Sequence, residues 1–161
     1  MPYIISIIGK SKSGKTTLVE KLIPVLKRRG YRIGTVKHAF HGFEVDKKGK
    51  DSYRHKAAGA DTVILSSPGK IALVKDTSCD SLDCLEAYLQ DMDIVIAEGY
   101  KKEDTPKIEV FLSEKHRRPL FQEGYDIIAF VTDLDIKAGV PKFDLGEIEK
   151  LADLIEKMPL K

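Results

Sequence analysis

Residues 9–17 read GKSKSGKTT, so two glycines stand among lysines, serines and threonines directly after an apolar run. Gly9, Gly14, Lys15 and Thr16 occupy the fixed positions of G-x-x-x-x-G-K-[ST]. Such a loop points backbone N–H groups at an anion, and the helix that follows adds its positive N-terminal end. Lys15 can reach the β- and γ-phosphates, and the Thr16 hydroxyl can ligate Mg²⁺. This phosphate loop predicts nucleotide contacts from Gly9, Lys10, Ser11, Lys12, Ser13, Gly14, Lys15, Thr16 and Thr17.

An acid, Glu98, ends the apolar segment 93–98. Nucleotide hydrolases with a phosphate loop need a second acid near Mg²⁺, usually an aspartate on a neighbouring strand. Glu98 could hold Mg²⁺ through a water or orient the attacking water. The alternative is an acid at a strand end that faces solvent.

A polar loop, 38–50, contains a third acid, Asp46. Its length is typical of a switch segment that senses the γ-phosphate. Asp46 and Asp51 are both candidates to contact Mg²⁺ or the attacking water. The predicted catalytic residues are therefore Lys15, Glu98 and Asp46, and the predicted metal contacts are Thr16, Glu98 and Asp46.

Thr132 and Asp133 follow a further apolar segment, in the stretch Thr-Asp-Leu-Asp. A carboxylate only accepts hydrogen bonds, so Asp133 could take both donors on one edge of guanine. Asp135 is the fallback. The N-K-x-D pattern of guanine-nucleotide proteins is absent, and a simple turn aspartate is the competing interpretation.

Lys37, His38, His41 and Lys101 fall at neighbouring strand ends. Their cations and donors could hold the phosphate of a further ligand or bind a partner protein, although the same groups could serve the nucleotide alone. Too few histidines and cysteines cluster for a zinc site. Cys79 and Cys84 are expected to be reduced thiols.

Strands alternate with helices along the chain, which favours an α/β fold with a mostly parallel sheet flanked by helices. Segments with nearly continuous apolar character fit central parallel strands, whose carboxyl ends carry ligands. The pattern predicts strands at 3–8, 31–37, 93–98, 107–112 and 126–132, helices at 15–29, 51–59, 80–91 and 144–157, and a hairpin of 62–66 with 71–75.

The chain has 161 residues, which suits one nucleotide-binding domain, 1–161. Its net charge of +2 gives no argument for nucleic acid binding. No apolar run approaches the roughly 20 residues of a membrane helix. The sequence enters a strand without a signal peptide, so we expect no membrane association and a cytoplasmic location.

Several short motifs together resemble those of one family. They are the phosphate loop, Thr35-Val36-Lys37-His38, Gly49-Lys50-Asp51-Ser52, Gly59-Ala60, Glu98-Gly99-Tyr100-Lys101 and Pro106-Lys107-Ile108. This set resembles the molybdopterin-guanine dinucleotide biosynthesis adaptor proteins of type B, over nearly the whole chain. The set is specific to the family, whereas the phosphate loop alone is not.

The resemblance implies a three-layer P-loop fold and a homodimer that binds GTP with Mg²⁺ and hydrolyses it weakly. It also implies a partner, the nucleotidyltransferase that joins GMP to molybdopterin. Other molybdenum-cofactor proteins are further candidates. So is molybdopterin itself, whose phosphate and pterin could be held by Lys37, His38, His41 and Lys101. Glu98 and Asp46 lie in the matching acidic motifs. Lys10 stands where related dimeric ATPases carry a lysine that reaches the other subunit's nucleotide, which this family does not require.

Two other functions compete with this interpretation. A small P-loop kinase acting on a nucleoside or another small molecule would need arginines in a lid, for which Arg117 and Arg118 are the candidates. A pure binding module would use nucleotide as a structural ligand without hydrolysis. Steady-state phosphate release separates the binding module from a GTPase, and phosphate appearing on a second small molecule would support the kinase.

Overall fold

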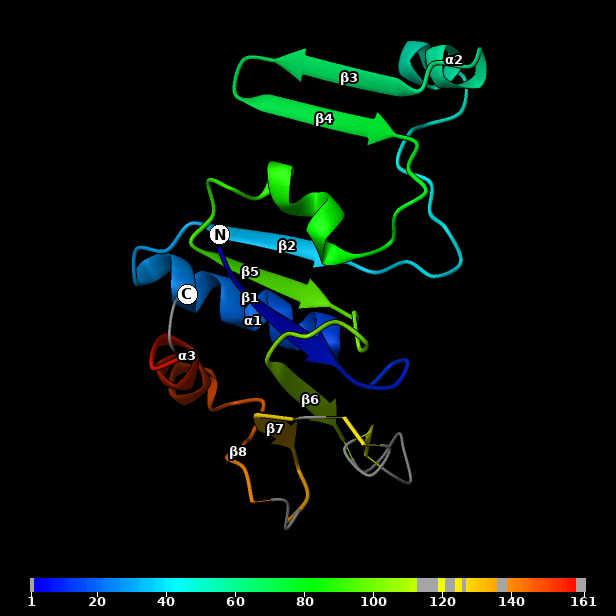
Figure 1. The fold of residues 1–161 in the computed structure, drawn as a ribbon. Helices are drawn as coiled ribbons and strands as arrows, with labels where there is room; N and C mark the ends of the chain where they lie inside the picture. The colour runs from blue at the N-terminus through cyan, green and yellow to red at the C-terminus, as the bar shows by residue number, and fades with distance from the viewer. Residues whose placement is uncertain (1, 113–118, 121–123, 126, 136–138, 159–161) are drawn as a thin grey trace. The chain divides into compact units, whose positions relative to one another are not determined.

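The computed structural model describes residues 2–112, 119–120, 124–125, 127–135 and 139–158. The chain forms two compact units (Figure 1). The first comprises Met1–His38 with Ser81–Lys161, and the second is Ala39–Asp80. The expectation of a single domain over 1–161 stays a prediction.

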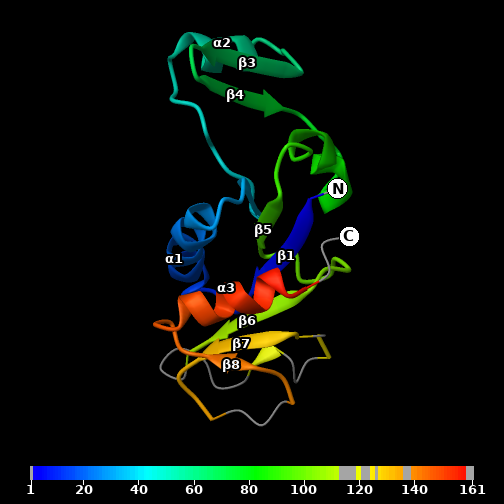
Figure 2. The same cartoon turned by 90° about the vertical axis from the view of Figure 1, so that its left-hand side faces the viewer.

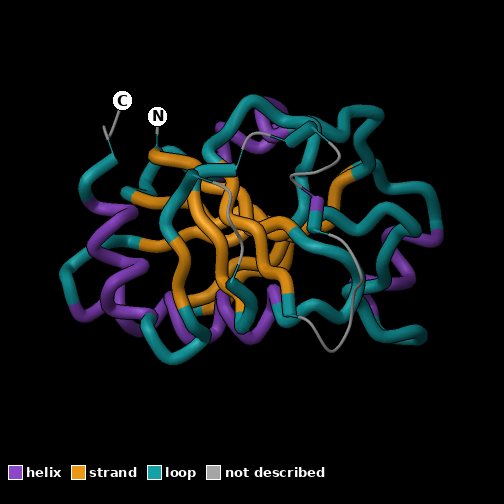
Figure 3. Tube along the Cα trace, turned by 90° about the horizontal axis from the view of Figure 1, so that it is seen from below, coloured by secondary structure: helices purple, strands orange, loops and turns teal. Residues whose placement is uncertain are grey.

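The first unit is built on a six-stranded sheet (Figure 3). Its order is β2-β5-β1-β6-β7-β8, and all its paired strands run parallel. Buried apolar side chains fill its central strands, as expected for parallel strands covered on both faces. The bounds are β1 Tyr3–Ile8, β2 Ile33–Lys37, β5 Ile94–Glu98, β6 Lys107–Phe111, β7 Ala129–Thr132 and β8 Lys142–Phe143.

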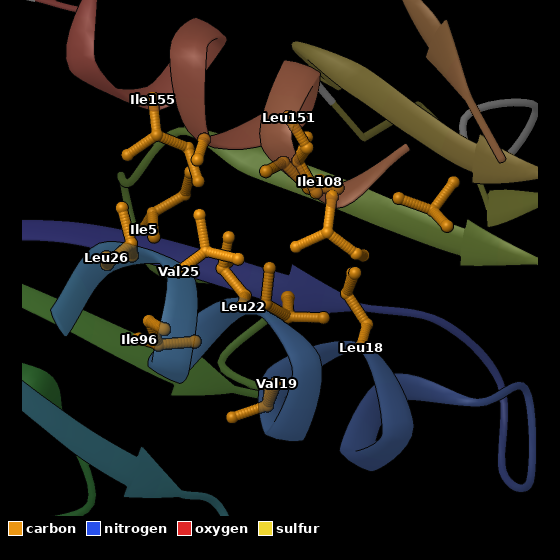
Figure 4. Packing of buried hydrophobic residues seen from close by; sticks show 14 of the residues in the cluster. Ile5, Leu18, Val19, Leu22, Val25, Leu26, Ile96, Ile108, Leu151 and Ile155 are labelled. Carbon is orange, nitrogen blue, oxygen red and sulfur yellow. The ribbon is translucent and has the colours of Figure 1, made fainter. Parts of the chain in front are cut away.

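Two helices, α1 (Lys15–Arg28) and α3 (Ile148–Glu156), cover one face of this sheet (Figure 2). Leu18, Leu22 and Leu26 recur one turn apart on α1 and pack on the sheet (Figure 4). Arg29, just after α1, forms ion pairs with three acids of α3, Glu149, Asp153 and Glu156. These contacts hold α1, and with it the phosphate loop, against the sheet.

A short 3₁₀ helix, η1 (Leu82–Tyr88), packs on the opposite face. Leu82 contributes to a cluster with Ala97 and Tyr100 there. The α/β fold, with a parallel sheet between helices, is therefore confirmed.

Several details differ from the sequence-based expectations. No strand was predicted at β8, and β2 and β7 begin later than residues 31 and 126. The helix predicted at 80–91 is the shorter η1. Asp80, Ser81 and Asp83 lie at its start, and such side chains compete with the backbone for hydrogen bonds. The last helix begins at Ile148 rather than at residue 144. The chain's two cysteines, Cys79 and Cys84, are disulfide-bonded, so the expectation of reduced thiols is wrong. That expectation rested on the reducing conditions of the cytoplasm. It took no account of how close the two cysteines are in the sequence.

The second unit contains α2 (Asp51–Ala57) and a hairpin of β3 (Thr62–Ser67) and β4 (Lys70–Lys75). The antiparallel register pairs Val63 with Val74 and Ser67 with Lys70, which confirms the hairpin predicted near 62–75. Val63 is buried, whereas Ile64, on the other face of β3, is exposed. Among the described residues, no helix has the length and apolar character needed to cross a membrane.

Candidate functional site

The phosphate loop connects the end of β1 to the start of α1 at the carboxyl edge of the sheet. Gly9 has a φ of 152°, and a Cβ atom there would lie 2.5 Å from both the Val110 carbonyl oxygen and Ser13 Oγ. Gly14 has a φ of 99°, in the left-handed region that favours glycine. Both fixed glycines of the motif are therefore required by the backbone.

The Lys15 side chain folds back over this loop. Its Nζ donates hydrogen bonds to the carbonyl oxygens of Gly9, at 3.1 Å, and Lys10, at 2.8 Å. Burial lowers the pKa of Lys15, the Glu98 carboxylate opposes that shift, and the Lys101 and Lys37 ammonium groups add to it. The negative charge of an incoming phosphate would oppose both of these pKa-lowering effects.

Thr16 and Glu98 meet at the same edge of the sheet. Thr16 Oγ1 lies 3.1 Å and 3.3 Å from the two carboxylate oxygens of Glu98, where β5 ends beside β1. A hydroxyl and a carboxylate are hard oxygen ligands that fit Mg²⁺, which usually keeps several waters and takes substrate phosphates as further ligands. No group of three or more His, Cys, Asp or Glu side chains that could hold a metal occurs in the described ranges.

Two of the four residues predicted for the cofactor or partner surface carry charges near Lys15. After burial, which is the largest cause, Lys101 and Lys37 also lower the pKa of Lys15. The His38 backbone N–H donates to the Glu98 carbonyl oxygen, and its ring lies 5.0 Å from that of Tyr100. His38 therefore packs at the same edge through an aromatic contact.

His41 and Asp46 belong to the second unit. The Asp46 carboxylate accepts a hydrogen bond from the backbone N–H of Lys47 at 2.8 Å. The roles of His41 at the cofactor surface and of Asp46 beside Mg²⁺ stay predictions.

A cavity of about 260 Å³ lies where β7 and β8 end. Thr132 and Asp133 line it, and Thr132 Oγ1 accepts a hydrogen bond from the Leu134 N–H at 3.1 Å. Their role in binding the base stays a prediction. Lys142 Nζ lies 2.6 Å from Asp135 Oδ1 and lowers the pKa of that carboxyl. The remaining lining residues are Leu134, Asp135, Lys142, Phe143, Asp144 and Glu147.

Sequence reasoning missed Lys142, Phe143 and Asp144 at this cavity. They lie in and after β8, a strand of two residues, Lys142–Phe143. Two residues are too few for a period-2 pattern to show.

Residues 4–133 match the family model "MobB: Molybdopterin guanine dinucleotide synthesis protein B". The chain belongs to the MobB family. The match begins in β1 and ends at Asp133, so it includes the phosphate loop, Glu98 and two residues that line the cavity, Thr132 and Asp133.

Relatives of the same family cover nearly the whole chain. The molybdopterin-guanine dinucleotide biosynthesis adapter protein of Haemophilus influenzae is 38% identical over 156 residues, 95% of this chain and 87% of that protein. The Escherichia coli protein of the same name is 37% identical over 152 residues, 90% of this chain and 86% of its own.

Solved structures of the family share the fold. A crystal structure of molybdopterin-guanine biosynthesis protein B (MobB) has a TM-score of 0.75 and 33% identity, covering 95% of this chain and 97% of the other. Bacillus subtilis MobB has a TM-score of 0.78 and 27% identity, covering 99% of both chains. The family assignment therefore rests on sequence and on fold.

Proposed function

We propose that this MobB-family protein binds GTP with Mg²⁺ at the phosphate loop and hydrolyses it slowly. In this proposal it serves as an adaptor to the nucleotidyltransferase that joins GMP to molybdopterin. The observation that carries the proposal is the convergence of Lys15, Thr16 and Glu98 at one sheet edge, with Thr16 Oγ1 3.1 Å from the Glu98 carboxylate. The relatives' names support the biosynthetic role.

Slow hydrolysis follows from the groups present. Efficient GTPases place a water-orienting residue and an arginine at the transferred phosphate. Here Glu98 is the acid beside Thr16, and lysines supply the nearby charge. Arg117 and Arg118, the lid candidates of the kinase alternative, lie outside the described residues.

Steady-state phosphate release from GTP tests the activity, with Glu98→Gln beside the wild type. Glu98→Gln keeps the shape and removes the charge, so we expect turnover to fall about 100-fold while GTP still binds. Glu20→Gln, an exposed acid on α1, is the matched control. Unchanged turnover in Glu98→Gln would make the acid merely structural, and phosphate on a second small molecule would favour the kinase.

The cavity at the ends of β7 and β8 supports guanine as the base. It lies at the carboxyl edge of the sheet, where ligands of such folds bind. Asp133 lines it and offers only acceptors, which suits the N1 hydrogen and the 2-amino group of guanine. Adenine lacks both donors on that edge, so this carboxylate would discriminate against ATP.

A homodimer is supported by the hairpin of the second unit. Ile64, Ile71 and Leu73 share one face of β3 and β4, and their exposures are 62%, 73% and 38%. A two-stranded sheet alone is marginally stable in water, and three or more strands or a covering element are needed. We expect a second copy to cover this face. Light scattering should show a dimer that Ile71→Glu converts to a monomer, whereas a monomeric wild type would contradict the dimer.

The adaptor role is tested by capture from cells. The tagged protein with GTP and Mg²⁺ should retain a molybdopterin nucleotidyltransferase, and Lys15→Ala should retain less of it. Retention that does not depend on nucleotide would separate the adaptor role from GTP binding.

A further inference from the structure

Lys37 and Glu98 end two neighbouring parallel strands and are direct partners in the register of β2 and β5. Side chains alternate between faces along a strand, and register partners share a face. Ile94 and Ile96, which precede Glu98 at even spacing, pack in the core cluster that contains Leu18 and Leu22 of α1. Lys37 and Glu98 therefore lie on the face that α1 covers, where α1 also presents Thr16.

The Lys37 ammonium pairs with the acid predicted to serve Mg²⁺. Lys37 Nζ lies 3.4 Å from Glu98 Oε1, and Thr16 Oγ1 contacts the same carboxylate. The Glu98 side chain is only 15% exposed, whereas that of Lys37 is 66% exposed. The carboxylate is thus held in place, while the lysine can swing away without uncovering a buried surface.

A metal ion and this ammonium would compete for the same carboxylate. Like charges within a few ångströms repel each other. Mg²⁺ held between Thr16 and a water on Glu98 would add two positive charges beside Lys37. The arriving phosphates would give a displaced ammonium a new anionic partner.

We propose that Lys37 occupies the place of the metal beside Glu98 in the nucleotide-free protein, and that Mg²⁺–nucleotide expels it. The released ammonium then pairs with the terminal phosphate of a triphosphate. The second step rests on the proposed function, whereas the exchange at Glu98 concerns the metal alone. Lys37, the last residue of β2, thus pairs with Glu98 in the nucleotide-free protein and with the terminal phosphate when a triphosphate is bound.

The first arm of the test uses no nucleotide. Free Mn²⁺ is measured by electron paramagnetic resonance with wild type, Lys37→Gln and Lys27→Gln, an exposed lysine of α1 that matches the change in charge. We expect Lys37→Gln to bind Mn²⁺ about two- to fivefold more tightly than wild type, the range for an exposed ion pair. Lys27→Gln should match wild type. The gain should vanish when Glu98→Gln is added. Equal Mn²⁺ binding by wild type and Lys37→Gln, or a gain that persists with Glu98→Gln, overturns the exchange.

The second arm compares GDP with a non-hydrolysable GTP analogue at saturating Mg²⁺. Lys37→Gln should lose about tenfold in affinity for the analogue relative to GDP, since it lacks a charge-assisted bond to the terminal phosphate. Lys37→Arg should keep most of that preference. Lys101→Gln, with the same change in charge, should weaken both nucleotides alike. An unchanged preference in Lys37→Gln overturns the phosphate contact. A wild type that binds neither nucleotide overturns the proposed function and that contact, while the Mn²⁺ arm still decides the exchange.

Discussion

At the phosphate loop, a Cβ atom on Gly9 would lie 2.5 Å from the Val110 carbonyl oxygen, whereas at the cavity beyond β7 the side chains of Asp133 and Asp135 are exposed. The phosphate end is set by backbone packing between β1, α1 and β6. The proposed base end is lined by side chains in and around β7 and β8. Substitutions at the first region should therefore abolish binding, and substitutions at the second should change which ligand binds.

Among the substitutions that compare these two regions, the largest effect is expected for Gly9→Ala. A Cβ atom there meets the Val110 carbonyl, and a φ of 152° is unfavourable for alanine. The loop must shift, so we expect GTP affinity to fall about 100-fold, which corresponds to about 3 kcal/mol. Calorimetric titration with GTP and Mg²⁺ measures it.

Gly30→Ala is the control for backbone strain, because Gly30 also has a positive φ, of 95°, but nothing lies within 4 Å of its Cβ position. It should lose some stability and keep GTP affinity. If Gly9→Ala binds GTP as tightly as wild type, the phosphate loop accepts a side chain at Gly9. The proposed difference between the two regions would then be wrong.

The second effect concerns the identity of the base. Asp133→Asn offers one donor and one acceptor, which suits xanthine better than guanine. We expect GTP affinity to fall by about 1–3 kcal/mol, the cost of an unpaired polar group, and XTP affinity to rise. Titrations with GTP, ATP and XTP measure the change, and Asp135→Asn is the matched variant two residues along the loop. If Asp135→Asn changes the preference from GTP to XTP instead, then Asp135 and not Asp133 recognises the base.

The smallest effect concerns the exposed ion pair at the cavity. Lys142 holds the pKa of Asp135 below its ordinary value of 3.8. A carboxyl with a depressed folded-state pKa stabilises the fold above its unfolded pKa, and that stability is lost as pH falls through the folded value. The melting temperature of Lys142→Gln should lie slightly below that of wild type at pH 6, and the difference should vanish near pH 2. A difference that persists in acid would assign the role of Lys142 to packing.

The same contrast explains what the sequence could predict. Gly9, Gly14, Lys15 and Thr16 form a contiguous motif with one backbone solution, so the phosphate loop and the strand and helix around it were predictable. The neighbouring apolar strands were predictable for the same reason, because their pattern is local.

One contact that depends on strand order was not predicted from the sequence. Lys37 and Glu98 are far apart in the sequence and meet because β2 lies beside β5. Sequence reasoning placed Lys37 on a cofactor or partner surface and had no means to pair it with Glu98. The cavity residues after β8 were missed because that strand is too short to leave a pattern.

The central claim is that the phosphate loop binds Mg²⁺–GTP, and the most direct test is calorimetric titration of Lys15→Ala beside wild type and Lys27→Ala. Lys15 Nζ lies over the loop, bonded to the carbonyl oxygens of Gly9 and Lys10, and has no part in the core of the sheet. Wild type and Lys27→Ala should bind GTP alike, and Lys15→Ala should show no measurable binding while its circular dichroism stays that of wild type. GTP affinity in Lys15→Ala equal to that of wild type would contradict the account.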